Sequence, residues 1–263
     1  MTTLPKARRW AAVAAGGVLL LAACGDDDAT SNNSTTATTD ATATPVIDPG
    51  DGGHYAPKLD PADFVAVVDN PYLPFVPGSK WVYEGDDNGD TERSETVVLD
   101  ETRMIEGIAA TVAHDTVYTN GELAEDTYDW YAQDKDGNVW YLGEDTHEIE
   151  NGKPVSSEGA WEYGKDGALP SIVMPAHPKL GDAYRQEFHE GDAEDMAEIT
   201  KVGATTEIGL GSYDDVVVTK EWSPVEPDII ENKAYAPGIG VIQELTKAGG
   251  TGTVELTEFT PAS

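Results

Sequence analysis

The amino-acid sequence predicts an all-β or β-rich domain built as an antiparallel meander, with one short N-terminal helix. Apolar and β-branched residues alternate with polar ones at a period of two through most of the chain after residue 80. The 27 glycines and 16 prolines fall largely in turn-like clusters with Asp and Asn, as expected for many short elements. Helical segments long enough to link parallel strands are missing from the pattern, which disfavours a parallel sheet with a nucleotide crevice.

The helix is expected to begin at Asp60. Asp60 can serve as an N-cap, Pro61 fits the first helical position, and Asn70-Pro71 would end the helix. Strands are predicted at residues 80–84, 94–103, 108–118, 122–133, 138–145, 183–190, 195–202, 213–222, 229–236, 239–247 and 252–259.

The segment from Tyr128 to Glu144 is predicted to form a β-hairpin. Asp136-Gly137 between two alternating runs is typical of a type I′ turn. A turn at that pair places Gln133 opposite Trp140 and Ala132 opposite Tyr141. The expected core face then carries Tyr128, Trp130, Ala132, Val139 and Tyr141.

The other face of this hairpin is partly apolar and therefore needs a cover. The segment 160–180, which contains Trp161, is one candidate cover, and a ligand or partner is another. Core packing is the simpler interpretation of these aromatic residues. The candidate ligand face consists of Tyr131, Trp140, Leu142 and Trp161.

Acidic residues in the same hairpin suggest a calcium site. Asp134, Asp136 and Asn138 place three oxygen-bearing side chains around a glycine, and hard cations prefer oxygen ligands. The spacing does not match an EF-hand, because Ala132 and Gly143 would occupy its first and twelfth positions. An Asp-rich turn without a metal is the simpler interpretation, and no other cofactor is expected.

Glu187 and His189 form a second polar group, on the strand predicted at 183–190. Residues two apart on a strand share a face, so this pair could contribute to a metal or proton-transfer site. Such a site needs a third group from elsewhere. Exposed polar residues on a strand are the simpler interpretation.

The N-terminal residues indicate export. Lys6, Arg8 and Arg9 precede an uncharged apolar stretch from Trp10 to Ala23. About 14 residues are too few for a confident membrane-spanning helix, which needs about 20. Leu21-Ala22-Ala23-Cys24 resembles the lipobox of bacterial lipoproteins. The resemblance implies lipidation of Cys24, cleavage before it, acylation such as palmitate on the new amino terminus, and a lipid anchor on the extracytoplasmic face of the cell membrane.

The chain is therefore expected to have three parts. Residues 1–23 form the signal peptide. Residues 24–57 are the lipidated cysteine and a disordered tether rich in Thr, Asp and Ala, with too few large apolar residues to fold. Residues 58–263 form a single β-rich domain.

Several short segments resemble known envelope proteins. Residues 235–242, Tyr-Ala-Pro-Gly-Ile-Gly-Val-Ile, resemble a hairpin of bacterial envelope proteins whose curved antiparallel sheets form half-barrels. The segments 70–74, 129–133 and 174–176 together resemble uncharacterised lipoproteins of high-GC Gram-positive bacteria. These resemblances imply a curved half-barrel sheet in a cell-envelope lipoprotein, and no activity.

The net charge and the absence of catalytic motifs narrow the range of functions that the sequence supports. The formal net charge is -33, from 49 acidic and 16 basic residues, which disfavours binding to nucleic acid. The sequence has neither a nucleophile elbow nor a His-Glu-x-x-His motif, and the one cysteine is expected to be acylated. We therefore expect a noncatalytic binding domain for a small molecule, lipid, glycan or protein. The alternative is a calcium-stabilised structural or adhesion domain.

Overall fold

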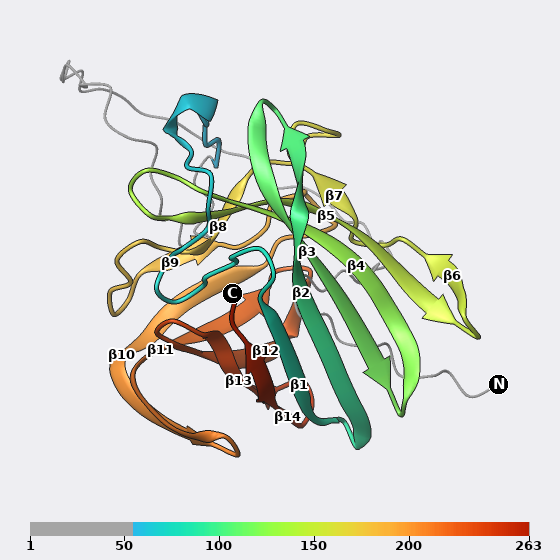
Figure 1. Cartoon of the computed structure of the whole chain (residues 1–263). Helices are drawn as coiled ribbons and strands as arrows, with labels where there is room; N and C mark the ends of the chain where they lie inside the picture. Colours follow the sequence, from blue (N-terminus) through green and yellow to red (C-terminus); the bar gives the residue numbers. More distant parts are fainter. Residues whose placement is uncertain (1–54, 263) are drawn as a thin grey trace, which may run out of the picture.

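The computed structural model describes residues 55–262, which form one strongly curved antiparallel sheet (Figure 1). The strand order is β6-β5-β4-β3-β2-β1-β14-β13-β12-β11-β10-β9, and β7 and β8 also pair with β5. The strands are β1 (Lys80–Asp87), β2 (Asp90–Ile105), β3 (Ile108–Thr119), β4 (Glu122–Gln133), β5 (Val139–Glu150), β6 (Lys153–Ser156), β7 (Trp161–Glu162), β8 (Ser171–Met174), β9 (Ala183–Arg185), β10 (Met196–Ile208), β11 (Gly211–Ser223), β12 (Glu226–Ala236), β13 (Gly240–Ala248) and β14 (Gly252–Thr260).

Two meanders make up this sheet. Strands β1 to β6 follow one another on one side, and β9 to β14 on the other. The first strand pairs with the last, from Lys80 opposite Thr260 to Asp87 opposite Gly252, and this pairing joins the meanders. The sheet is open, because its path runs from β6 to β9 without returning. The prediction of an antiparallel meander is confirmed.

Most strand positions agree with the sequence prediction, with the exceptions between β5 and β10. The expected strand 183–190 ends as β9 at Arg185, and the short strands β6, β7 and β8 were missed. β7 has only two residues and β8 only four. Elements this short have no detectable period of two, so their pairing with β5 is decided by tertiary contacts.

The predicted N-terminal helix is wrong beyond its first turn. Asp60 does cap a turn, since its side chain accepts the Ala62 N–H at 2.9 Å, but the turn is a 3₁₀ element η1 (Pro61–Asp63). Phe64 is already extended. The Val65 N–H donates to the Gln133 carbonyl at 2.9 Å. Pairing with the end of β4 therefore replaces the helical hydrogen bonds.

After this turn, the segment 69–75 connects the two meanders at one end of the sheet. The buried Asn70 side chain donates through Nδ2 to the Gly137 carbonyl at 2.8 Å in the β4–β5 loop. The neighbouring Pro71 carbonyl accepts the Gly238 N–H at 2.6 Å in the β12–β13 turn. One short segment thus contacts a hairpin from each half.

The β4–β5 hairpin has a register one residue away from the predicted one. Tyr131 lies opposite Tyr141, Ala132 opposite Trp140, and Gln133 opposite Val139. The connection is a five-residue loop closed by the hydrogen bond from Asp134 N–H to the Asn138 carbonyl (3.0 Å), not a two-residue turn. A shift of one residue in register places the side chains of one strand on the opposite face relative to those of its partner. Val139 and Tyr141 therefore lie on the other face from Trp130 and Ala132, and the predicted core face is not a single face.

The β12–β13 turn agrees with the expected type II geometry at Pro237-Gly238. Gly238 has a φ of 76°, as the third residue of such a turn requires. The Ile239 N–H donates to the Ala236 carbonyl at 3.2 Å and closes the turn.

The connection made by Asn70 leads to a prediction about stability. Replacing Asn70 with alanine leaves the carbonyl of the half-buried Gly137 without this donor and removes the Oδ1 acceptor of the Tyr72 N–H. We expect the free energy of unfolding to fall by about 1–3 kcal/mol in urea titrations. Asn232→Ala is the matched control, because this half-buried side chain forms no hydrogen bond within residues 55–262. Equal stability of the two variants would contradict the connecting role of Asn70.

Candidate functional site

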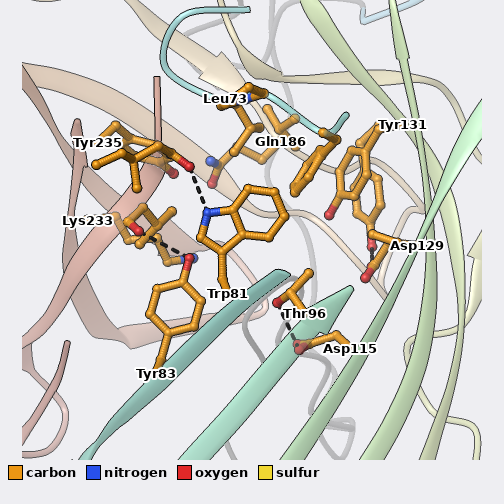
Figure 2. A pocket seen from close by; sticks show the side chains of 18 of the residues that line it. Leu73, Trp81, Tyr83, Thr96, Asp115, Asp129, Tyr131, Gln186, Lys233 and Tyr235 are labelled. Carbon is orange, nitrogen blue, oxygen red and sulfur yellow. Dashed lines mark hydrogen bonds between the residues drawn. The ribbon is translucent and has the colours of Figure 1, made fainter. Parts of the chain in front are cut away.

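A pocket of about 100 Å³ lies on the concave side of the sheet and is the candidate site (Figure 2). Its walls come from both meanders, with β1 to β5 on one side and β12 and β13 on the other. Figure 2 shows Trp81 at the centre, with Lys233 and Tyr235 on one flank and Tyr131 on the other. The volume exceeds that of a single water and approaches the roughly 150 Å³ of an engineered cavity that holds benzene.

Strand alternation explains why these side chains meet. Trp81 pairs with Thr96, and Thr96 pairs with Asp115, so the three share the concave face of β1, β2 and β3. Ala113 faces the same way and pairs with Asp129 of β4. Since residues two apart share a face, one polar and aromatic row crosses four strands.

The polar atoms of the aromatic side chains mostly bond to the protein. Trp81 donates through Nε1 to the Ile239 carbonyl at 2.7 Å, and the Tyr83 hydroxyl donates to the Val241 carbonyl at 3.1 Å. The Tyr141 hydroxyl donates to Asp129 at 2.5 Å. These bonds fix the orientation of the rings.

Tyr131 differs from the other aromatic residues in the pocket. Its ring stacks between Phe75 and Tyr141, with centroid distances of 4.4 and 4.7 Å. Only 6% of the residue is exposed, yet its hydroxyl has no hydrogen-bond partner within the described chain. Burial, together with the charges of Asp129 and Glu144, raises the pKa of this phenol well above its ordinary value. The hydroxyl is therefore a neutral donor available to a ligand.

Asp115 is a buried carboxyl group in the pocket wall. Its one side-chain hydrogen-bond donor is Thr96, whose Oγ1 lies 3.1 Å away. Burial raises the pKa of Asp115 well above its ordinary value, and the charges of Asp129 and Glu125 raise it further. No lysine, arginine or histidine of residues 55–262 forms an ion pair with it. Asp115 is thus destabilised in its charged form.

Lys233 is the one basic residue in the described wall of the pocket. Its ammonium lies 2.9 Å from Glu221 and 3.7 Å from Glu244. Burial acts to lower the pKa of Lys233, but these two carboxylates hold it well above its ordinary value. The lysine is charged and already neutralised by acids outside the pocket lining.

The connection from β5 to β10 supplies the remaining wall. β8 pairs with β5 at one end of the open sheet, and β9 pairs with β10 at the other. Val173 and the buried Gln186 and Glu187 of this connection line the pocket. The segment that sequence analysis described least well thus spans the opening between the two ends of the sheet.

The structure separates the four residues of the candidate ligand face. Tyr131 lines the pocket, and Trp161 contacts Tyr141 edge-on with ring centroids 5.3 Å apart. Trp140 and Leu142 flank Tyr141 in sequence and therefore lie on the opposite face of β5, both buried. The cover expected from the segment 160–180 is present as β7 and β8, which extend the sheet beside β5.

The predicted metal ligands serve the loop between β4 and β5. The Asp134 carboxylate accepts the N–H groups of Asp136 (3.0 Å) and Asn138 (2.9 Å), and the Nδ2 of Asn138 (2.8 Å). It also accepts the Trp140 indole N–H at 2.8 Å. Within residues 55–262, no three His, Cys, Asp or Glu side chains lie close enough together to hold a metal ion.

Glu187 and His189 lie apart. Glu187 is 1% exposed and lines the pocket, so the expectation of an exposed strand residue is wrong for it. His189 lies beyond the end of β9, where its Nδ1 is 3.3 Å from Asp192.

The predicted lipidation site Cys24, the signal peptide and most of the tether lie outside the described residues. Within residues 55–262, no helix has the length and apolar character needed to span a membrane.

Comparisons with known proteins identify two similar folds. One is a protein described as exported, with a YmcC-like fold, from Bacteroides fragilis, at 15% identity and a TM-score of 0.43, covering 72% of this chain and 99% of that one. The other is described as a lipoprotein of Parabacteroides distasonis, at 13% identity and a TM-score of 0.38, covering 73% and 99%. No family model and no curated protein matches the chain. The resemblance to lipoproteins of high-GC Gram-positive bacteria stays a prediction.

The burial of Asp115 leads to a prediction about pH. A carboxyl whose folded-state pKa is raised binds more protons in the folded than in the unfolded state, so stability falls as pH rises above the ordinary carboxyl range. Asp115→Asn keeps the shape of the side chain, and because an amide does not ionise, it removes this loss of stability at high pH. We expect a melting temperature higher by a few degrees at pH 8 and a smaller decline between pH 5 and 8.

Thermal unfolding of wild type and variant at both pH values tests this expectation. Asp100→Asn, an exposed change on β2, is the matched control and should leave the pH dependence unchanged. A melting temperature lowered by Asp115→Asn at pH 8 would show that the ionised carboxylate stabilises the fold.

Proposed function

We propose that this protein is a noncatalytic binding module of the cell envelope, held at the extracytoplasmic face of the membrane by acyl chains on Cys24. The observation that carries the binding role is the concave pocket, which collects aromatic rings, carboxyl groups and the unpartnered Tyr131 hydroxyl. Ligand sites are typically concave, largely apolar and furnished with a few polar groups that set orientation. The anchor rests on Leu21-Ala22-Ala23-Cys24 and the charged and apolar residues before it.

The arrangement of the pocket favours binding over catalysis. A general base or nucleophile needs a reacting atom within reach of a second group that activates it. Within the described chain, the pocket wall contains the hydroxyl–carboxyl pairs Thr96–Asp115 and Tyr141–Asp129 but no histidine, cysteine or serine, the residues that most often act as base or nucleophile. Its hydroxyl and carboxyl groups are instead arranged around fixed rings, as in a recognition surface.

The tether and the domain have separate roles in this proposal. The chain between Cys24 and the first described residues is rich in Thr, Asp, Ala and Gly. About 30 such residues would reach roughly 30 Å on average as a flexible chain, enough to hold the domain away from the bilayer. The pocket would then meet ligands in the space outside the membrane.

Anchoring by Cys24 is tested by metabolic labelling with an alkyne fatty acid in a bacterial host. We expect label on the wild-type protein and none on Cys24→Ala, because thioether lipidation precedes cleavage and acylation. Immunoblotting of both proteins controls for expression. Equal labelling of the two proteins would exclude the lipobox as the modification site.

Binding in the pocket is tested with a panel of small cationic, neutral and anionic compounds, by thermal shift. We expect at least one class to raise the melting temperature of the wild type, because a ligand that binds only the folded state stabilises it. Ala113→Leu fills the pocket from β3 and should abolish the shift.

Ala124→Leu, on β4 and outside the pocket wall, is the matched control and should retain the shift. A response that survives in Ala113→Leu would place binding elsewhere, and no response from any compound would contradict the proposed function.

A further inference from the structure

Three hairpin turns at one end of the sheet are built from the same dipeptide, Asn-Gly, which occurs three times in the sequence. They are Asn88-Gly89 between β1 and β2, Asn120-Gly121 between β3 and β4, and Asn151-Gly152 between β5 and β6. In each turn the two flanking residues pair with each other, so the loop has two residues. The φ angles are 51° to 53° at the asparagines and 70° to 92° at the glycines, as a type I′ turn requires. The three turns therefore share one backbone geometry.

An Asn-Gly pair can modify itself chemically. After base removes its proton, the glycine nitrogen attacks the side-chain Cγ of the asparagine, and the missing glycine side chain leaves this approach open. A new C–N bond forms, the C–N bond of the side-chain amide breaks, and ammonia leaves. Water then opens the five-membered imide at one of its two carbonyls, which gives aspartate or isoaspartate. Ring closure requires the asparagine side chain and the following peptide plane to rotate, so anything that holds them slows the reaction.

The Asn120 turn is held in this way by the start of β2. The Oδ1 of Asn120 accepts the Thr91 N–H at 3.1 Å, and its Nδ2 donates to Asp90 at 2.8 Å. The Asn120 N–H also donates to the Thr91 carbonyl at 2.8 Å. Both ends of the side-chain amide are therefore engaged.

The Asn88 turn is held by the turn between β13 and β14. The Oδ1 of Asn88 accepts the Thr251 N–H at 3.0 Å, and the Asn88 N–H donates to the Thr251 carbonyl at 2.7 Å. Its Nδ2 donates to the Asp87 carboxylate at 3.2 Å. This side chain is thus also engaged at both ends.

The Asn151 turn differs from these two. All three asparagines are exposed, but within residues 55–262 the Asn151 side chain forms no hydrogen bond. The strand that follows it, β6, has four mostly exposed residues and lies at the end of the sheet, where β5 is its neighbour (Figure 1). Segments with few buried contacts open locally at lower free energy than central strands. Asn151 is therefore unrestrained and lies in a segment that opens readily.

We propose that Asn151 is a site of slow self-modification, at which attack by the Gly152 nitrogen yields aspartate and isoaspartate while Asn88 and Asn120 are preserved. The reaction consumes water and releases ammonia. Each conversion adds one negative charge, and isoaspartate also adds one atom to the main chain of the turn. Neither residue lines the pocket, so the modification is independent of ligand binding.

The test follows the three asparagines in one sample of the full-length protein, purified from membranes in nonionic detergent. The protein is incubated at pH 8 for days to weeks and digested at mildly acidic pH, which limits deamidation during the digest. Mass spectrometry quantifies the three peptides, and electron-transfer fragmentation distinguishes isoaspartate from aspartate. A parallel sample is unfolded in guanidinium chloride.

We expect Asn151 to be converted at least about tenfold faster than Asn88 or Asn120 in the folded protein, because several hydrogen bonds must break before either of these can react. In guanidinium chloride the three rates should converge, since the turns no longer exist.

Two variants test the protective hydrogen bonds at Asn120. Asp90→Ala removes the acceptor of its Nδ2 and should raise its conversion rate about two- to tenfold. Glu122→Ala is the matched control, because it removes an exposed acid that flanks the same turn and keeps both partners of the Asn120 amide. The Asn151 rate should be unchanged in both variants and serves as the internal reference.

Conversion of Asn88 or Asn120 as fast as that of Asn151 in the folded protein would overturn the proposal. So would an unmodified Asn151 over a period in which the unfolded chain is converted, because the edge turn would then be closed to the reaction. An unchanged Asn120 rate in Asp90→Ala would contradict hydrogen bonding as the cause of the selectivity.

Discussion

The pairing of the first strand with the last is the constraint on which the rest of the structure depends. β1 and β14 are distant in sequence, and their antiparallel pairing turns two local meanders into one curved sheet. The pocket exists only because of this pairing, since β1 to β5 and β12 to β13 line opposite sides of it. The segment around Asn70 and Pro71 adds a second connection between the halves, through one side-chain and one backbone hydrogen bond. The fold is thus held at its centre and at one end.

The sequence predicted the fold well because the strands are long and alternate regularly. The type II turn at Pro237-Gly238 was predictable from two residues whose conformations are restricted. The β4–β5 register was not, because the Asp134 carboxylate organises a five-residue loop that competes with the expected two-residue turn. The prediction of the N-terminal helix was wrong for a similar reason. Its cap formed at Asp60, but Val65 found a backbone partner in Gln133, which no local pattern reveals.

The candidate site was predictable only in part. Tyr131 was expected on the candidate ligand face, and it lines the pocket. Asp115 and Lys233 were missed, although Asp115 alternates with Ala113 and Val117 on one strand, which is an acidic residue within an apolar face. The sequence alone could therefore have singled out Asp115. Asp115 and Tyr131 lie on the paired strands β3 and β4, but their meeting with Lys233 of β12 depends on the β1–β14 pairing and could not be read from any segment alone.

Half-buried and buried carboxylates occur in this domain in two contrasting environments, and Asp115 differs from the others. Asp134 accepts four hydrogen bonds from its own loop and Trp140, and Glu221 lies 2.9 Å from the Lys233 ammonium. The fold therefore has the means to satisfy a buried acid. At Asp115 it provides the Thr96 hydroxyl, the Thr116 N–H and neighbouring negative charges but no basic side chain within residues 55–262, and the Tyr131 hydroxyl in the same pocket has no hydrogen-bond partner in that part of the chain. Polar groups left in this state beside a cavity are what a binding site requires, because a ligand gains the free energy that the empty fold forgoes.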